Sequence, residues 1–183
     1  MKNSRKLVLT IGTISLLTFS AFKLLKSEWK VKSEDAKITF TMPNGKHSGT
    51  VSGLNASFDF DPAHPELAAI SATVEVKNLQ ADNPKLTEHL MTADFFDAAN
   101  HPTVTFKAEH VEKNDTGFVA TGKLAMRDSV HTVSIPFTFK QTDKAALING
   151  KLDIFSGDYG VGKKSAAGND RVVISIEVPV TKE

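Results

Sequence analysis

The amino-acid sequence predicts an all-β fold in which short antiparallel strands form a barrel, with one short helical excursion at an end. From Glu28 onward, apolar residues alternate with polar ones through most of the chain, which is the pattern of strands with one buried face. Turn-forming clusters separate these segments, such as Pro43-Asn44-Gly45 and Asn114-Asp115-Thr116-Gly117. The same pattern fits a sandwich, but we favour a barrel because closure removes the apolar strand edges.

The alternation defines the individual strands. The clearest segments are 38–42, 56–60, 70–76, 104–108, 124–126, 133–139 and 172–180. A further run passes through Leu152 and Ile154, and Asn149-Gly150 lies before them. That pair is typical of hairpin turns, but the alternation resumes at once. We therefore interpret it as a glycine bulge inside one long strand.

One segment departs from the strand pattern. Asn83 followed by Pro84 is a specific helix start, with an N-cap residue and a proline in the first turn. Leu86 and Leu90 then share one helical face, and the turn 94–97 carries two further phenylalanines. We expect Leu90, Phe95 and Phe96 to cover one end of the barrel.

The first 27 residues have the layout of a targeting segment. Three basic residues precede an apolar stretch over 7–22, which is short for a membrane span of about 20 residues. A signal peptide cleaved near Ala21 would leave the domain 28–183 in the periplasm or secreted. An uncleaved anchor extending through Leu25 would hold the same domain at the inner membrane. We expect cleavage, and the anchor stays open as the alternative.

Charge and composition exclude several classes of function. Five of the 22 basic residues lie before Glu28 and none of the 21 acidic residues does, so the domain has a net negative charge. Such a domain lacks the positive field that binding to nucleic acid requires. The chain has no cysteine, which excludes disulfides, thiolate catalysis and cysteine-ligated zinc.

No motif predicts catalysis or a metal. Gly157 to Lys163 matches the start of a phosphate-binding loop, but Lys164 occupies the position of the required Ser or Thr and a strand follows instead of a helix. We interpret this segment as a glycine-rich connection between strands. The six histidines lack the local spacing of metal ligands, and no G-x-S-x-G motif is present. A hydrolase or lyase is therefore the least favoured class.

Phenylalanine is the informative residue type, with twelve in the chain and ten in the domain. Strand parity turns Phe40, Phe58, Phe106 and Phe137 inward, and Met126 shares such a face. For any one of them, ordinary core packing is the simpler interpretation. Taken together, rigid apolar walls without converging charges suit a long hydrocarbon held in a barrel.

The domain resembles the YceI-like family of periplasmic, polyisoprenoid-binding, lipocalin-like proteins over residues 29–181. The shared motifs are Val51-Ser52-Gly53-Leu54, Phe58-Asp59-Phe60-Asp61-Pro62, His89-Leu90, Asp94-Phe95-Phe96-Asp97, His101 to Phe106, Thr121 to Leu124, Val130 to Phe139 and Asp158-Tyr159-Gly160-Val161-Gly162. Where members commonly carry an arginine before the last motif, this chain has Ser156. The resemblance implies an eight-stranded antiparallel lipocalin-like barrel around an isoprenoid chain, with no catalytic residues.

We therefore expect a non-catalytic envelope protein that binds an isoprenoid or similar long apolar lipid, a quinone included, for sequestration or transport. The alternative is a ligand-free barrel that acts through a protein partner in envelope stress or maintenance. We expect no metal or other cofactor, and a homodimer stays open. The expected ligand-binding residues are Phe40, Phe58, Phe106, Met126, Phe137, Leu90, Phe95, Phe96 and Tyr159.

Overall fold

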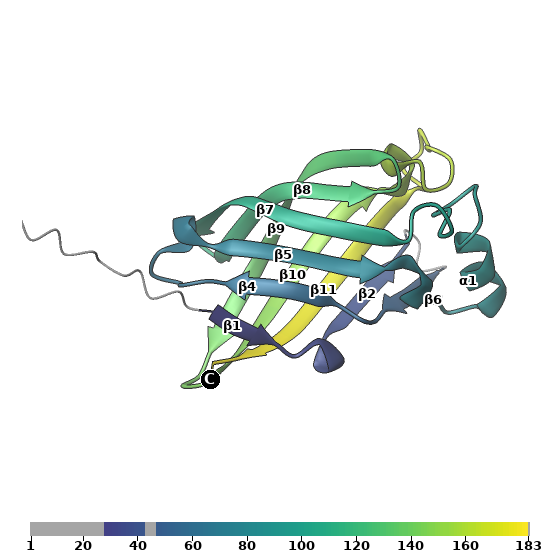
Figure 1. The fold of residues 1–183 in the computed structure, drawn as a ribbon. Helices are drawn as coiled ribbons and strands as arrows, with labels where there is room; N and C mark the ends of the chain where they lie inside the picture. The colour runs from purple at the N-terminus through teal and green to yellow at the C-terminus, as the bar shows by residue number, and fades with distance from the viewer. Residues whose placement is uncertain (1–27, 43–46, 183) are drawn as a thin grey trace, which may run out of the picture.

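Eight antiparallel strands form a closed ring in the computed structural model, which describes residues 28–42 and 47–182 (Figure 1). In ring order they are β1 (Glu28–Val31), β4 (Asn55–Asp59), β5 (Ala69–Glu75), β7 (Thr103–Asn114), β8 (Gly117–Met126), β9 (Ser129–Gln141), β10 (Ala145–Phe155) and β11 (Arg171–Thr181). Pairing of β1 with β11 closes the ring. The predicted eight-stranded barrel is confirmed, while the predicted leader and the Pro43-Asn44-Gly45 turn lie outside the described residues.

Three further strands extend the sheet beyond the ring at one end. They are β2 (Lys37–Thr41), β3 (Ser48–Val51) and β6 (Leu79–Ala81). β2 pairs with β11, β3 pairs with β2, and β6 pairs with β3. Among the described strands, β6 has no second neighbour, because β7 pairs with β5 and β8 instead. The sheet is therefore divided between β6 and β7 at this end.

Short irregular segments separate the ring strands from these extensions. A 3₁₀ turn, η1 (Ser33–Asp35), lies between β1 and β2, and η4 (Val76–Asn78) lies between β5 and β6. Another turn, η3 (Pro65–Leu67), precedes β5. The turns η1 and η4 each let one stretch of chain pair with different neighbours along its length, whereas η3 connects β4 and β5 within the ring.

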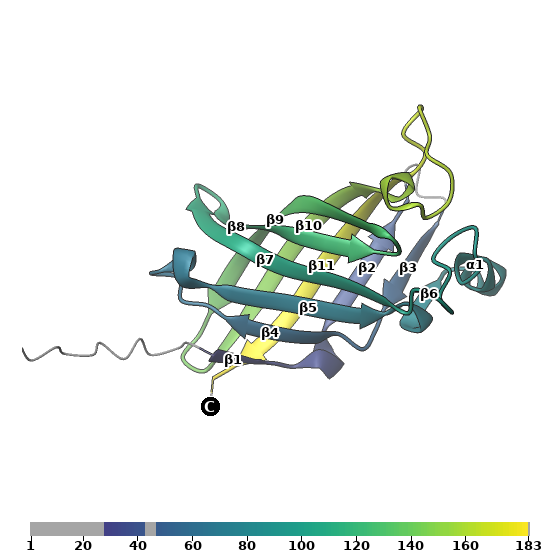
Figure 2. The same ribbon diagram turned by 45° about the horizontal axis from the view of Figure 1, so that its top comes forward.

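The helix α1 (Pro84–Leu90) follows β6 and lies at the divided end of the barrel (Figure 2). Its predicted start is confirmed, because the Asn83 side chain accepts a hydrogen bond from the Lys85 backbone N–H at 2.9 Å. Turns over 91–102 then lead into β7. Within the described part of the chain, no helix has the length and apolar character that crossing a membrane requires.

The predicted glycine bulge at Asn149-Gly150 is wrong, although the long strand is confirmed. Both residues lie in unbroken register between β10 and β11. The register shift occurs instead in β7, between Ala108 and His110. Gly122 on β8 faces it, and a Cβ there would lie 2.2 Å from the Lys107 carbonyl oxygen. Close approach of two backbones thus requires this glycine.

The glycine-rich segment after β10 connects two strands, as the sequence analysis predicted. It begins with the 3₁₀ turn η5 (Ser156–Tyr159) and continues without regular structure to β11. Gly160 ends η5 with a φ of 70°, a conformation that favours glycine. A helix does not follow this segment, so it lacks the geometry of a phosphate-binding loop.

Candidate functional site

A cavity of about 280 Å³ lies inside the barrel. Inward-facing apolar side chains from nearly every strand line it, as the period of two requires. In the described part of the chain the lining contains no charged side chain, and its few polar members carry hydroxyl groups. An ion placed here would lose its hydration without a partner, so the cavity favours an apolar occupant.

Small residues give the cavity its width. Ala56 on β4 pairs with Ala72 on β5, and Ala120 and Gly150 line the cavity from β8 and β10. A Cβ added at Gly150 would meet its nearest neighbour, an Ile135 methyl group, at 3.4 Å. A methyl group at Gly150 would therefore fit in ordinary van der Waals contact with its neighbours, and a larger side chain there would extend into the cavity that Gly150 lines.

The end of the barrel beside β1 is closed by four aromatic side chains, Trp29, Phe60, Phe118 and Phe139, which we call the aromatic plug. Phe60 packs edge-on against Phe118 and Phe139, with ring centroids 4.9 and 5.1 Å away. Trp29 packs on Phe139 at 5.1 Å, and its Nε1 donates to the Phe60 carbonyl oxygen at 3.0 Å. Trp29 and Phe60 are 2% and 1% exposed. The plug is thus a dense, hydrogen-bonded floor.

The opposite end is covered by side chains from α1 and the turns that follow it. We call residues 84–98 the lid. Leu86 and Leu90 of α1 line the cavity, together with Phe95 and Phe96 from the following turn. Leu90 also packs with Phe40 and Leu79 in a second buried cluster. The lid covers the place where the sheet divides between β6 and β7.

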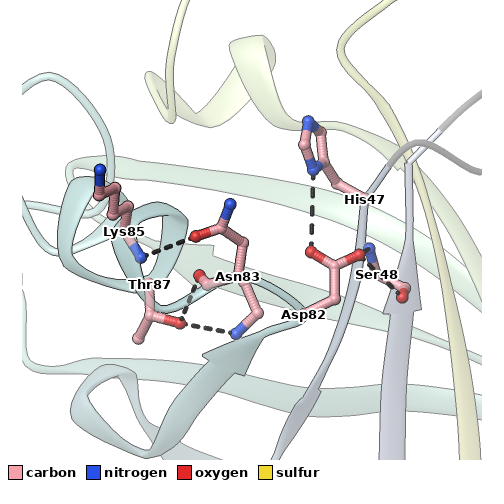
Figure 3. A network of polar contacts seen from close by, with 7 residues as sticks. His47, Ser48, Asp82, Asn83, Lys85 and Thr87 are labelled. Atoms are coloured by element: carbon pink, nitrogen blue, oxygen red, sulfur yellow. Dashed lines mark hydrogen bonds and ion pairs between the residues drawn. The ribbon is translucent and has the colours of Figure 1, made fainter.

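Polar contacts anchor the beginning of the lid (Figure 3). Thr87 Oγ1 accepts a hydrogen bond from the Ala81 N–H at 2.9 Å, which satisfies part of the free edge of β6. Asp82 accepts from the Ser48 backbone N–H at 2.9 Å, and His47 Nδ1 lies 3.8 Å from its other oxygen. These contacts join α1 to β3 and β6, so the first turn of the lid is fixed to the sheet.

Arg127 anchors the far part of the lid. It lies in the turn between β8 and β9 with a φ of 51°. One of its guanidinium nitrogens, Nη1, donates to the carbonyl oxygens of both Phe95 and Gly160. The Gly162 N–H also donates to the Asp94 carbonyl at 3.1 Å. The lid is therefore held to two separate loops, and Arg127 bridges all three segments.

Comparison with known proteins is consistent with this architecture. The family model of the YceI-like domain matches residues 29–182 of this sequence. The chain belongs to the YceI family. A UPF0312 protein of Azotobacter vinelandii is 28% identical over 139 residues, covering 70% of this chain and 72% of that protein.

Two solved structures share the YceI barrel. BcnA of Burkholderia cenocepacia superposes with a TM-score of 0.75 at 23% identity, covering 83% of this chain and 100% of that one. A polyisoprenoid binding domain from Saccharophagus degradans, implicated in plant cell wall breakdown, superposes with a TM-score of 0.62 at 7% identity. That match covers 85% of this chain and 98% of the domain. At these identities, both matches show a shared fold.

Eight of the nine residues that the sequence analysis assigned to ligand binding line the cavity of this YceI domain. They are Phe40, Phe58, Phe106, Met126, Phe137, Leu90, Phe95 and Phe96. Strand parity located the first five, and the helix start located the other three. Their contact with a ligand stays a prediction.

Tyr159 is not among the lining residues. It lies in η5, is 3% exposed, and packs edge-on against His131 with ring centroids 4.8 Å apart. Burial raises the pKa of its phenol above the usual value of 10, and the neighbouring Asp158 carboxylate adds to the effect. Its position after the barrel strand, outside the period of two, explains why parity gave no guide to it.

The small lining residues and Arg127 were not identified as site residues from the sequence. Gly150 was interpreted as a bulge, although its parity with Leu152 and Ile154 gave the signal that it faces the lumen. Arg127 gave no such signal, because its partners lie 32 and 33 positions away.

The ionisable groups of the described residues lie outside the cavity. Nowhere in residues 28–42 and 47–182 do three His, Asp or Glu side chains gather as metal ligands would. His101 Nε2 lies 3.9 Å from an Asp97 carboxylate oxygen and 3.5 Å from an Asp128 carboxylate oxygen, beside the lid. The arrangement can bind an apolar molecule, and among the described lining residues the polar side chains are hydroxyl groups.

Proposed function

We propose that this YceI protein is a non-catalytic carrier or store for a long apolar lipid of the isoprenoid class, a quinone included. The observation that carries the proposal is the apolar cavity between the aromatic plug and the lid. A cavity without lining charges offers affinity through burial of hydrocarbon and no group for chemistry.

Burial energies are sufficient for such a ligand. A buried methylene contributes about 0.8 kcal/mol, so one isoprene unit contributes roughly 3 kcal/mol before ordering costs. A few units would reach useful affinity without a polar anchor. The matched Saccharophagus domain is described as polyisoprenoid binding, which supports the same ligand class here.

The cell envelope is the proposed location. The basic and apolar layout of residues 1–27 supports export to the periplasm, with an inner-membrane anchor as the alternative form. A lipid of this kind is nearly insoluble in water, so movement between membranes requires a protein that shields it. Sequestration and transport are both compatible with the cavity, and a homodimer stays a separate expectation.

The test compares lipid binding in the parent protein with a variant whose lumen is filled. Gly150→Leu adds a side chain to the space inside the barrel, whereas the matched control Lys151→Leu adds the same side chain to the outer face of β10. We expect Gly150→Leu to weaken isoprenoid binding about tenfold, the equivalent of about two displaced methylenes. The control should bind like the parent.

Native mass spectrometry of protein from its own host measures bound mass, and organic extraction identifies the lipid. Recovery of an isoprenoid that Gly150→Leu fails to retain would support the proposal. A parent protein that carries no lipid and binds none on titration would contradict it, and would favour the barrel that acts through a protein partner.

A further inference from the structure

The two ends of the cavity are closed differently, and this difference indicates the end at which an apolar ligand enters. The plug end is closed by the strand ring and by the buried side chains of Trp29, Phe60 and Phe118, with the half-buried Phe139 packed against them. The lid end is covered by a seven-residue helix and by turns, at the division between β6 and β7. An apolar chain that enters does so past the lid and advances toward the plug.

In each of five strands, the lining of the cavity ends at one inward residue. On each strand, one inward residue lines the cavity and the next inward residue toward the plug does not. The last lining residues are Phe58, Ala120, Phe137, Ile148 and Val178. The residues behind them are Phe60, Phe118, Phe139, Ala146 and Val180. The cavity therefore has a floor at the plug end, to which these five strands contribute.

Phe58 and Phe137 form the inner surface of that floor. Phe137 stacks on Phe118 with ring centroids 5.5 Å apart and lies 5.5 Å from Phe60. Phe58 lies 5.3 Å from Phe60 and 6.4 Å from Phe137. The two rings therefore face the lumen on one side and rest on the plug on the other.

We propose that Phe58 and Phe137, supported by the aromatic plug, determine the length of apolar chain that the cavity accommodates. This inference rests on the proposed function. Each isoprene unit that enters the lumen adds affinity, because it leaves water for an apolar environment. Once the chain end reaches Phe58 and Phe137, a further unit stays outside the lumen and adds no affinity.

The experiment measures dissociation constants for a ladder of all-trans isoprenoid alcohols, beginning with geraniol, farnesol and geranylgeraniol. Displacement of the fluorescent apolar probe N-phenyl-1-naphthylamine reports binding. In the parent protein, affinity should rise about tenfold or more per unit and then reach a plateau.

Two Phe→Ala variants then distinguish a change in the depth of the cavity from a change in its width. Phe137→Ala opens the floor by a phenyl ring, which is comparable in size to one isoprene unit, so its plateau should come one unit later. Phe106→Ala removes the same ring from the wall, where Phe106 pairs with Ala72 and Leu124. Its plateau should stay where the parent has it.

A third variant tests the same floor from the other direction. Ala120→Leu adds volume just above the floor and should bring the plateau one unit earlier. This measurement is informative even if Phe137→Ala does not fold. Identical plateaus in the parent, Phe137→Ala and Ala120→Leu would overturn the length inference, as would an equal shift in Phe106→Ala. A parent that binds no alcohol of any length would overturn the proposed function itself.

Discussion

The two ends of the barrel close the same cavity by different means. At the plug end, strands pair around the full ring and four aromatic side chains pack edge to face over one another. At the lid end, the sheet divides, and a short helix with its following turns covers the opening. The plug is held by dense aromatic packing, whereas the lid combines the packing of Leu90 against Phe40 and Leu79 with hydrogen bonds to the sheet and to two loops. The two ends of one molecule thus differ in what holds them closed.

Removing an aromatic side chain should have the largest effect on this comparison. Phe60→Ala leaves a hole in the plug and should lower the free energy of unfolding by about 3–5 kcal/mol. Phe95→Ala removes the same ring from the lid, where Phe95 is only half-buried, and should cost less than half as much. Urea denaturation followed by circular dichroism measures both. Equal losses of unfolding free energy in the two variants would show that both ends contribute equally to stability.

A smaller effect is expected from Arg127, which holds the lid. Arg127→Ala removes the donor to the Phe95 and Gly160 carbonyls and should cost about 1–3 kcal/mol. Hydrogen exchange within 91–98 should become faster, while exchange in the strands of the plug end stays unchanged. Arg171→Ala, which removes a surface pair with Asp153, is the control and should leave the lid protected. If hydrogen exchange in the lid is equally slow in Arg127→Ala and the parent, Arg127 does not anchor the lid.

The smallest expected effect concerns pH and the region beside the lid. Tyr159 is the single tyrosine of the chain, so the ultraviolet absorbance of tyrosinate reports its ionisation alone. Its raised pKa means that the folded protein holds this proton more tightly than the unfolded chain. That contribution to stability is complete below the unfolded value of about 10 and is lost as pH rises through the folded value.

The phenol should therefore titrate above its usual pKa in the folded protein and return to that value in urea. Between pH 9 and pH 11, the parent should lose more stability than Tyr159→Phe, in which this group is missing. A folded-state titration at the usual value would show that the side chain is hydrated. The same result would mean that the η5 loop does not seal this side of the lid.

Period-two alternation predicted the ring and most of the lumen, because inward parity follows from the strand backbone itself. It could not show which inward residues leave space, since that depends on packing across the barrel. Phe58 and Phe60 share one parity, yet only Phe58 lines the cavity. The division between β6 and β7 and the bridging role of Arg127 were not predictable, because both depend on contacts between segments distant in sequence. Asn83-Pro84 was recognisable because capping is a local interaction.

The division of the sheet between β6 and β7 determines which bonds must break when the lid end of the barrel changes shape. Strands β5 and β7 stay paired up to Glu75 and Thr103, and only beyond them does β6 turn away. The lid end can therefore widen by rotation of side chains and release of loop contacts, while the hydrogen bonds between all ring strands stay intact. If a bulky ligand is loaded past the lid, as the proposed function requires, loading then needs a local opening in place of partial unfolding. Its rate should follow the strength of the Arg127 contacts and be independent of the global free energy of unfolding.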